Sequence, residues 1–212
     1  MEPGASTCES PHVLLYNSQV SGNCYKVRLL LRHLGIAFAK QELSVVDRSD
    51  RPAVIGGLNP ALRVPTLVLD DGRPLAESNA ILWYFGEGTP FVPDDRYDRA
   101  VVLQWMFFEQ YEHEPTIAVA RFLKAYSGEP EKHAETIASK LAGGNRALAA
   151  MEGWLAERPF FVGDRPTIAD IALFAYTHVA DEGGFDLERY PAIRAWLDRV
   201  AAWPGHVTMA DS

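Results

Sequence analysis

The hydrophobic pattern near the start of the chain predicts a short buried strand followed by an amphipathic helix. Val13 to Tyr16 form an apolar run that is too short for a helix and ends at polar Asn17. Helical spacing then links Tyr25, Val27, Leu29, Leu30, Leu31 and Leu34, with Lys26, Arg28 and Arg32 on the polar side. The turn between strand and helix, 21–24, directs unpaired N–H groups and the helix dipole at one point, which favours an anion there.

The pattern up to residue 88 predicts an α/β unit with a small mixed sheet. Its further elements are a strand within 37–45, a short or distorted helix within 49–58, a strand over 63–69, a strand over 73–76 and a helix over 79–85. Asp70-Asp71-Gly72 is a strong hairpin signal, and Glu77-Ser78 opens the last helix. Because proline cannot donate to a ladder, Pro65 belongs at the start or edge of its strand.

Beyond the proline-punctuated connector 90–95 the pattern is helical throughout. Helices are expected over 96–125, with a kink at Pro115, and over 133–157, 167–179 and 190–202, which together make a helical bundle. Thr167 and Asp170 form a capping-box pattern worth about 1 kcal/mol. We therefore expect one domain over residues 11–88 and a second, all-helical domain over residues 95–208.

Composition narrows the classes of function. The 212 residues are 48% hydrophobic and 23% charged, as in ordinary soluble globular proteins, and the formal net charge of −8 argues against a nucleic-acid partner. The chain has no apolar stretch of membrane-spanning length, and its first residues lack the features of a signal peptide. Two cysteines, Cys8 and Cys24, make no disulfide framework and favour a reducing cytoplasm. The histidines show no metal-ligand spacing, so no metal is expected.

Three anchors in this order give the chain a resemblance to the glutathione transferase superfamily. They are Val64-Pro65-Thr66-Leu67, then Glu77-Ser78 followed by Ala80-Ile81, then Gly163-Asp164-Arg165-Pro166-Thr167-Ile168-Ala169-Asp170. The resemblance covers the chain from His12 to about Trp203. It implies a thioredoxin-like N-terminal domain followed by an all-helical C-terminal domain, and glutathione as co-substrate.

The resemblance also implies how glutathione would bind. The Val64–Pro65 peptide would be cis and would turn the backbone of Val64 toward the cysteinyl unit of the tripeptide. Ser78, at a helix start, would hold the γ-glutamyl carboxylate, and Glu77 would take the ammonium. Arg63 lies beside this strand and would reach the glycyl carboxylate, although plain solvation equally suits an arginine at a surface position.

The strand–turn–helix places Ser21 where the serine-type classes of this superfamily carry their catalytic hydroxyl. Asn23 is a second candidate, because its amide would donate a further hydrogen bond to sulfur. A plain helix cap suits both residues as well. Tyr16 and Ser18 are rivals for the catalytic role. Cys24 occupies the second cysteine position of a thioredoxin-type motif, which normally points under the helix and favours a structural thiol over a redox nucleophile.

The expected activity is transfer of glutathione to a small hydrophobic electrophile. A glutathione-dependent reductase of disulfides or peroxides and a non-catalytic binding module are the alternatives. Aromatic and imidazole side chains of the helical part are candidates for the acceptor wall, although such residues at helical spacing also suit a core: Trp105, Phe108, Tyr111, His113 and Phe122. The resemblance further implies a homodimer.

Overall fold

A computed structural model describes residues 13–212, and a four-stranded mixed sheet opens the fold. The sheet has the order β2-β1-β3-β4. Its strands are β1 Val13–Asn17, β2 Phe38–Glu42, β3 Thr66–Val68 and β4 Pro74–Ala76. β1 runs parallel to β2 and antiparallel to β3, and β3–β4 is the expected hairpin. The expectations for the N-terminal lead-in, Cys8 included, lie outside the described residues.

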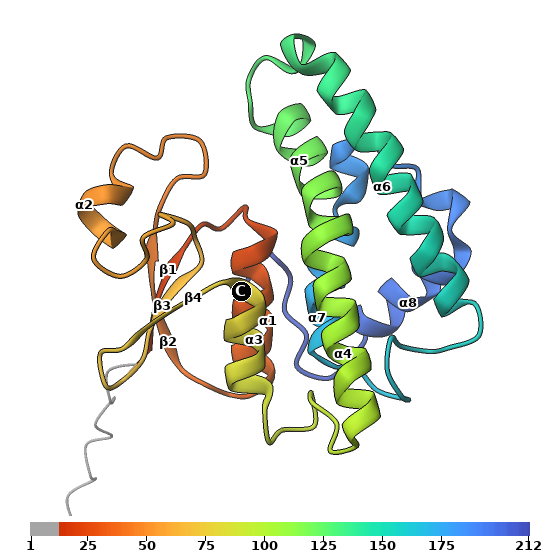
Figure 1. Ribbon diagram of the computed structural model, residues 1–212, viewed down its shortest axis with the longest axis horizontal. Coiled ribbons are helices and arrows are strands. Elements are labelled where there is room, and N and C mark those ends of the chain that lie inside the picture. The colour runs from red at the N-terminus through yellow and green to blue at the C-terminus, as the bar shows by residue number, and fades with distance from the viewer. Residues whose placement is uncertain (1–12) are drawn as a thin grey trace, which may run out of the picture.

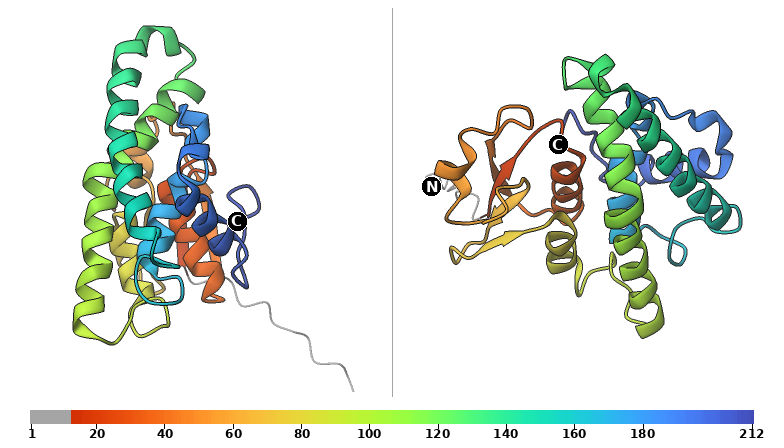
Figure 2. Two further views of the ribbon diagram at one scale, coloured as in Figure 1. Left: turned by 90° about the vertical axis from the view of Figure 1, so that its right-hand side faces the viewer. Right: turned by 45° about the horizontal axis from the view of Figure 1, so that its top comes forward.

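Two helices separate the sheet from the helical part of the chain. α1 Gly22–His33 and α3 Ser78–Gly86 lie between the sheet and the bundle, whereas the short α2 Arg51–Ile55 lies on the other side of the sheet (Figure 1 and the right-hand view of Figure 2). Leu15 of β1 and Leu67 of β3 pair in register and are fully buried beneath this layer. The helix predicted over 79–85 is confirmed, one residue longer at each end.

The predicted polar side of α1 is not a solvent face. Arg32 is exposed, but Lys26 and Arg28 are fully buried. Arg28 donates from Nη1 to Asn17 Oδ1 at 2.6 Å and from Nε to Ser212 Oγ at 2.8 Å. The guanidinium therefore ties the end of β1 and the C-terminal segment to α1, and the C-terminus lies beside the N-terminal end of that helix (Figure 1). Periodicity alone assigns such charges to the surface, because it does not see their partners.

The second part of the chain is helical, as predicted. Its helices are α4 Arg96–Phe108, α5 Glu114–Ala125, α6 Ala134–Leu155, α7 Ile168–Thr177 and α8 Pro191–Ala201. Short 3₁₀ turns lie at Pro130–His133, Ala180–Gly183 and Leu187–Arg189. A thioredoxin-like sheet followed by a helical domain is thus the confirmed fold class. Within residues 13–212, no helix combines the length and apolarity that a membrane crossing needs.

The helix predicted over 96–125 is interrupted just before Pro115. A π-helical turn, Glu109–His113, stands between α4 and α5, and the N–H of Glu114 donates to the carbonyl of Glu109. Pro115 has no N–H, so the carbonyl of Tyr111 lacks its regular helical donor at this point. The irregularity predicted from the proline is therefore present, as a π-turn that precedes it.

The capping box at the start of α7 is confirmed, and it does more than cap a helix. Asp170 is fully buried and accepts four hydrogen bonds at 2.8–3.1 Å. Their donors are the backbone of Phe161, the backbone and hydroxyl of Thr167, and the indole of Trp196. One carboxylate thus joins the loop before α7, its first turn and α8 in the centre of the bundle.

Replacing Asp170 with alanine should lower the free energy of unfolding by about 3–5 kcal/mol, because several buried donors lose their acceptor at once. Asp95→Ala is the matched control, since the exposed Asp95 side chain caps α4 by accepting from Tyr97 and Asp98. Its loss should cost only about 1 kcal/mol. Chemical denaturation of the two variants measures both numbers. Equal costs would contradict a special role for Asp170.

Candidate functional site

The first turn of α1 presents its donors to a cleft between the sheet and α5. Ser21 is the N-cap residue, with an extended backbone, and its Oγ accepts from the N–H of Cys24 at 3.3 Å. The hydroxyl proton of Ser21 is therefore left to donate elsewhere. Arg121 of α5 donates to the carbonyl of Val20 at 2.7 Å, which fixes the chain just before the cap.

Two adjoining pockets make up this cleft. The polar pocket has a volume of about 320 Å³ and is lined by Asn23, Arg63, Val64, Pro65, Glu77, Ser78, Gln110 and Glu114. The arginine pocket has a volume of about 210 Å³. It is lined by Val20, Ser21, Asn23, Val45, Arg48, Arg51, Arg63, Val64, Glu114, Ala118, Val119, Arg121, Phe122, Tyr126 and Tyr176. Ser21 and Ser78, which come from separate helices, thus border one continuous cleft.

The remaining predicted binding residues gather at the polar pocket. The Val64–Pro65 peptide is cis, as the family resemblance implied, and Arg63 beside it is exposed. Glu77 stands immediately before α3 with φ 66° and ψ 115°, a backbone region that costs a non-glycine residue about 1–3 kcal/mol. Such a conformation persists only where its surroundings impose it. Ser78, the first residue of α3, is buried beside Glu77.

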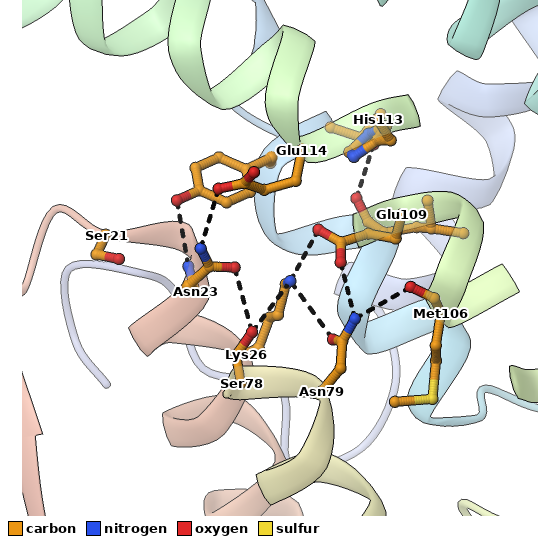
Figure 3. A network of polar contacts seen from close by, with 12 residues as sticks. Ser21, Asn23, Lys26, Ser78, Asn79, Met106, Glu109, His113 and Glu114 are labelled. Carbon is orange, nitrogen blue, oxygen red and sulfur yellow. Dashed lines mark hydrogen bonds and ion pairs between the residues drawn. The ribbon is translucent and has the colours of Figure 1, made fainter. Parts of the chain in front are cut away.

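A chain of hydrogen bonds sets the orientation of Asn23. Lys26 Nζ donates to Ser78 Oγ at 3.3 Å, Ser78 Oγ donates to Asn23 Oδ1 at 3.2 Å, and Asn23 Nδ2 donates to Glu114 Oε1 at 3.1 Å (Figure 3). A lysine ammonium only donates, so the hydroxyl of Ser78 must send its proton on to Asn23. The amide nitrogen of Asn23 therefore faces Glu114, and its second N–H is left for a ligand.

The π-helical turn brings two acids to the same side of α1. Lys26 Nζ and Glu109 Oε1 form an ion pair at 2.8 Å with both side chains fully buried, and Asn79 of α3 donates to the other carboxylate oxygen at 3.0 Å. Five residues along a regular α-helix correspond to a rotation of roughly 140°, which would turn Glu114 away from α1 when Glu109 faces it. A π-turn bonds residues five apart and brings them onto one side. Glu109 thus reaches Lys26 while Glu114 reaches Asn23.

Tyr176 of α7 closes the base of the cleft. Its hydroxyl accepts from the backbone N–H of Asn23 at 3.4 Å. A Cβ at Gly22 would lie 2.7 Å from the Tyr176 ring, so this first position of α1 requires glycine. Burial raises the pKa of the Tyr176 hydroxyl, and the charge of Glu114 adds to that rise. The phenol therefore stays protonated beside the turn.

The rivals for the catalytic role lie away from the cleft. Tyr16 is in β1, paired with Thr66, and Ser18 is buried with its backbone N–H donating to Cys24 Sγ at 3.3 Å. Neither residue lines either pocket. Cys24 is fully buried, and burial raises the pKa of its thiol to about 11, so the thiol stays protonated at neutral pH, as expected of a structural cysteine.

The expected acceptor wall needs correction, because only Phe122 of the five candidates lines the cleft. Trp105 packs in the bundle core, with its ring centroid 4.5 Å from that of Phe161, and Phe108 packs against Trp105. His113 is fully buried and bonded to Thr177, with a pKa lowered to about 3 by burial. Tyr111 is 81% exposed. The apolar side of the cleft comes instead from α5, through Ala118, Val119 and Phe122.

Sequence reasoning missed the buried network and most of the arginine pocket. Glu109 carried a signal, since it is an acid directly after the apolar run Trp105–Phe108. Pro115 signalled the altered helix that brings Glu114 into the site. Arg48 and Arg51 come from the irregular segment 49–58 or its border, where no periodic pattern points to a pocket. Among residues 13–212, no cluster of three histidine, cysteine or acidic residues is arranged to hold a metal ion.

Family models match both parts of the chain. The model described as "Glutathione S-transferase, N-terminal domain" matches residues 20–87, and the one described as "Glutathione S-transferase, C-terminal domain" matches residues 105–204. The sequence is 31% identical over 198 residues to glutathione S-transferase D7 of Anopheles gambiae, which covers 88% of this chain and 84% of the relative. It is 28% identical over 198 residues to maleylacetoacetate isomerase of Pseudomonas aeruginosa, covering 90% and 92%.

Solved structures agree with these matches. The glutathione S-transferase of Pseudomonas fluorescens superposes with a TM-score of 0.91 at 47% identity, covering 94% of this chain and 99% of the other. A glutathione S-transferase of Xanthobacter autotrophicus gives a TM-score of 0.89 at 46% identity, covering 94% and 97%. Ure2p in complex with glutathione gives 0.82 at 25% identity, covering 93% of each chain.

The buried ion pair under the site yields a prediction about stability. Lys26→Met should lower the free energy of unfolding by about 3–5 kcal/mol, because Glu109 is left charged and buried without its partner. Adding Glu109→Leu should restore most of that loss, since an apolar pair of similar volume needs no counter-charge.

The surface pair Lys132–Glu129, whose side chains are 69% and 59% exposed, supplies the control. Lys132→Met should cost less than about 1 kcal/mol. Guanidinium unfolding of the variants gives the values. A Lys26→Met protein as stable as the wild type would contradict the assignment.

Proposed function

The chain belongs to the glutathione S-transferase family, and we propose that it binds glutathione and stabilises the thiolate for attack on an electrophilic acceptor. The observation that carries this proposal is the common cleft. Ser21, Asn23, the cis Val64–Pro65 segment and Ser78 all line it, although they come from separate elements. A protein of the same fold that binds no ligand would not need these residues to line one cleft.

In this proposal the tripeptide lies in the polar pocket and extends into the arginine pocket, where its sulfur reaches Ser21. Its γ-glutamyl carboxylate binds at the backbone N–H groups of the N-terminus of α3, beside Ser78, and Glu77 takes the ammonium. The backbone of Val64 pairs with the cysteinyl unit, and Arg63 takes the glycyl carboxylate. The complex of Ure2p with glutathione, on a similar fold, supports the same ligand for this chain.

The sulfur then lies at the first turn of α1. Free thiols have a pKa of about 8.5, so only about 3% of glutathione is thiolate at neutral pH. Lowering that pKa by about two units requires about 2.7 kcal/mol. A hydroxyl donor to a charged acceptor contributes about 1.5–3 kcal/mol, and a helix N-terminus adds about 0.3–1 kcal/mol. The Ser21 hydroxyl and the α1 dipole are therefore sufficient, and the second N–H of Asn23 adds a further donor.

Ser21→Ala should raise the pKa of the bound thiol by about one to two units, because the anion loses its hydroxyl donor. The ultraviolet absorbance of the thiolate, followed against pH with glutathione bound, measures this shift. Ser21→Thr keeps a hydroxyl and a helix cap and should retain a low thiol pKa. Ser18→Ala removes a buried hydroxyl outside the cleft and serves as the matched control. An unchanged titration in Ser21→Ala would remove Ser21 from the mechanism.

We further propose a homodimer that uses the exposed face of α4 and the π-helical turn. Phe107 is 69% exposed and Tyr111 is 81% exposed, and the two lie about one helical turn apart. Large apolar side chains that gather on one exposed face mark interaction surfaces. A second copy of this chain is the partner that the family resemblance implies.

The purified protein should therefore show about twice the chain mass of 23.5 kDa in light scattering after size exclusion. Phe107→Asp combined with Tyr111→Asp should give single chains, since two desolvated charges oppose the contact. Val46→Asp changes another exposed apolar residue, 60% exposed beside the sheet, and should leave the mass unchanged. A wild-type protein with the mass of one chain would contradict the proposal.

A further inference from the structure

The arginine pocket concentrates positive charge beside the sulfur site. Four arginines line it, Arg48, Arg51, Arg63 and Arg121, together with a single acid, Glu114. Arg121 is already paired with Glu182 at 2.8 Å. Within the described chain, the other three arginines form no ion pair. Three guanidinium groups that form no ion pair therefore border one cleft.

Arg51 is the most constrained of the three. It is only 3% exposed, and its Nη1 and Nη2 donate to the carbonyls of Leu62 and Ser44 at 2.9 and 2.7 Å. Its Nε is buried without a partner. Burial lowers the pKa of this guanidinium, and the charge of Arg48 lowers it further. Asp50 opposes this lowering but forms no ion pair with Arg51. A buried cation that lacks an ion-pair partner is costly, so an anion in the pocket would stabilise this arrangement.

The pocket also has an apolar side. Ala118, Val119 and Phe122 of α5 line it from the helical part, whereas Arg48, Arg51 and Arg63 come from segments next to the sheet. A ligand that spans the pocket would therefore meet methyl and ring carbons at one side and guanidinium groups at the other. A ligand with an apolar body and a terminal carboxylate would be complementary to both sides of the pocket.

We propose that the acceptor substrate is an electrophile that carries a carboxylate, held by Arg48 and Arg51. This inference rests on the proposed function, which already assigns the γ-glutamyl carboxylate to Ser78 and the glycyl carboxylate to Arg63. Arg48 and Arg51 then remain for a third anionic group. Arg51 also braces the loops at Ser44 and Leu62. Arg48 is exposed, and within residues 13–212 its side chain makes one hydrogen bond, from Nε to the carbonyl of Val45 at 3.0 Å, so its two terminal nitrogens are available to a ligand.

Two chloroarene acceptors that differ by one group test the proposal, a chlorodinitrobenzene and a chlorodinitrobenzoate. In both, the thiolate sulfur forms a bond to the ring carbon that bears chlorine, chloride leaves with the bonding electrons, and the thiol proton passes to the buffer. Arg48→Gln should lower the ratio of kcat/KM for the benzoate to kcat/KM for the neutral acceptor about tenfold, which equals about 1.4 kcal/mol. Arg146→Gln is the matched control, because Arg146 is also exposed and donates only to a nearby carbonyl, that of Ala142. Its ratio should equal that of the wild type.

Calorimetry with the two finished glutathione conjugates gives a second readout that does not depend on turnover. The wild type should bind the carboxylated conjugate about tenfold more tightly, and Arg48→Gln should lose this preference. Equal binding of the two conjugates by the wild type would overturn the inference and leave the proposed function standing. A rise in KM for glutathione in Arg48→Gln, equal with both acceptors, would assign Arg48 to the glycyl carboxylate and also overturn it. Failure to bind either conjugate would contradict both proposals.

Discussion

A fully buried ion pair between Lys26 of α1 and Glu109 of the π-helical turn joins the sheet-bearing part of the chain to the bundle. A charged pair in this setting is stable only when hydrogen bonds satisfy its remaining donors and acceptors, and Ser78 and Asn79 of α3 supply them. Lys26 also fixes the direction of the bonds that run through Ser78 to Asn23. The position of the site thus depends on one ammonium group.

The backbone geometry of α1 and of the π-helical turn decides which side chains come into contact around this ion pair. Asn23 and Lys26 lie one turn apart on α1, so both face the same neighbours. The π-turn gives Glu109 and Glu114 the matching spacing on the opposite side, which a regular helix would not provide. Because Gly22 has no side chain, the ring of Tyr176 can lie against the first turn of α1. The residues that shape the cleft therefore lie at helix ends and at the π-helical turn, where the regular helical geometry is interrupted.

The sequence predicted those features that follow from local pattern. The strand at Val13–Asn17, the hairpin at Gly72 and the capping box of Asp170 each have a short-range signature, and all three are confirmed. Lys26 was assigned to a polar surface, because periodicity cannot show a partner that lies 83 residues away. Trp105 was a candidate for the acceptor wall, because helical spacing does not tell which side of α4 faces the core. Arg48 and Arg51 come from an irregular segment or its border, so only the three-dimensional structure brings them to Arg63 and Arg121.

The central claim is that glutathione places its sulfur over the first turn of α1, between Ser21 and Asn23. A crystal structure of the protein soaked with glutathione tests this most directly. In the proposed complex the sulfur should lie within hydrogen-bonding distance, about 3.5 Å, of Ser21 Oγ and close to Asn23 Nδ2, with the γ-glutamyl carboxylate at the start of α3. A sulfur placed away from this turn, or a cleft that stays empty at saturating glutathione, would contradict it.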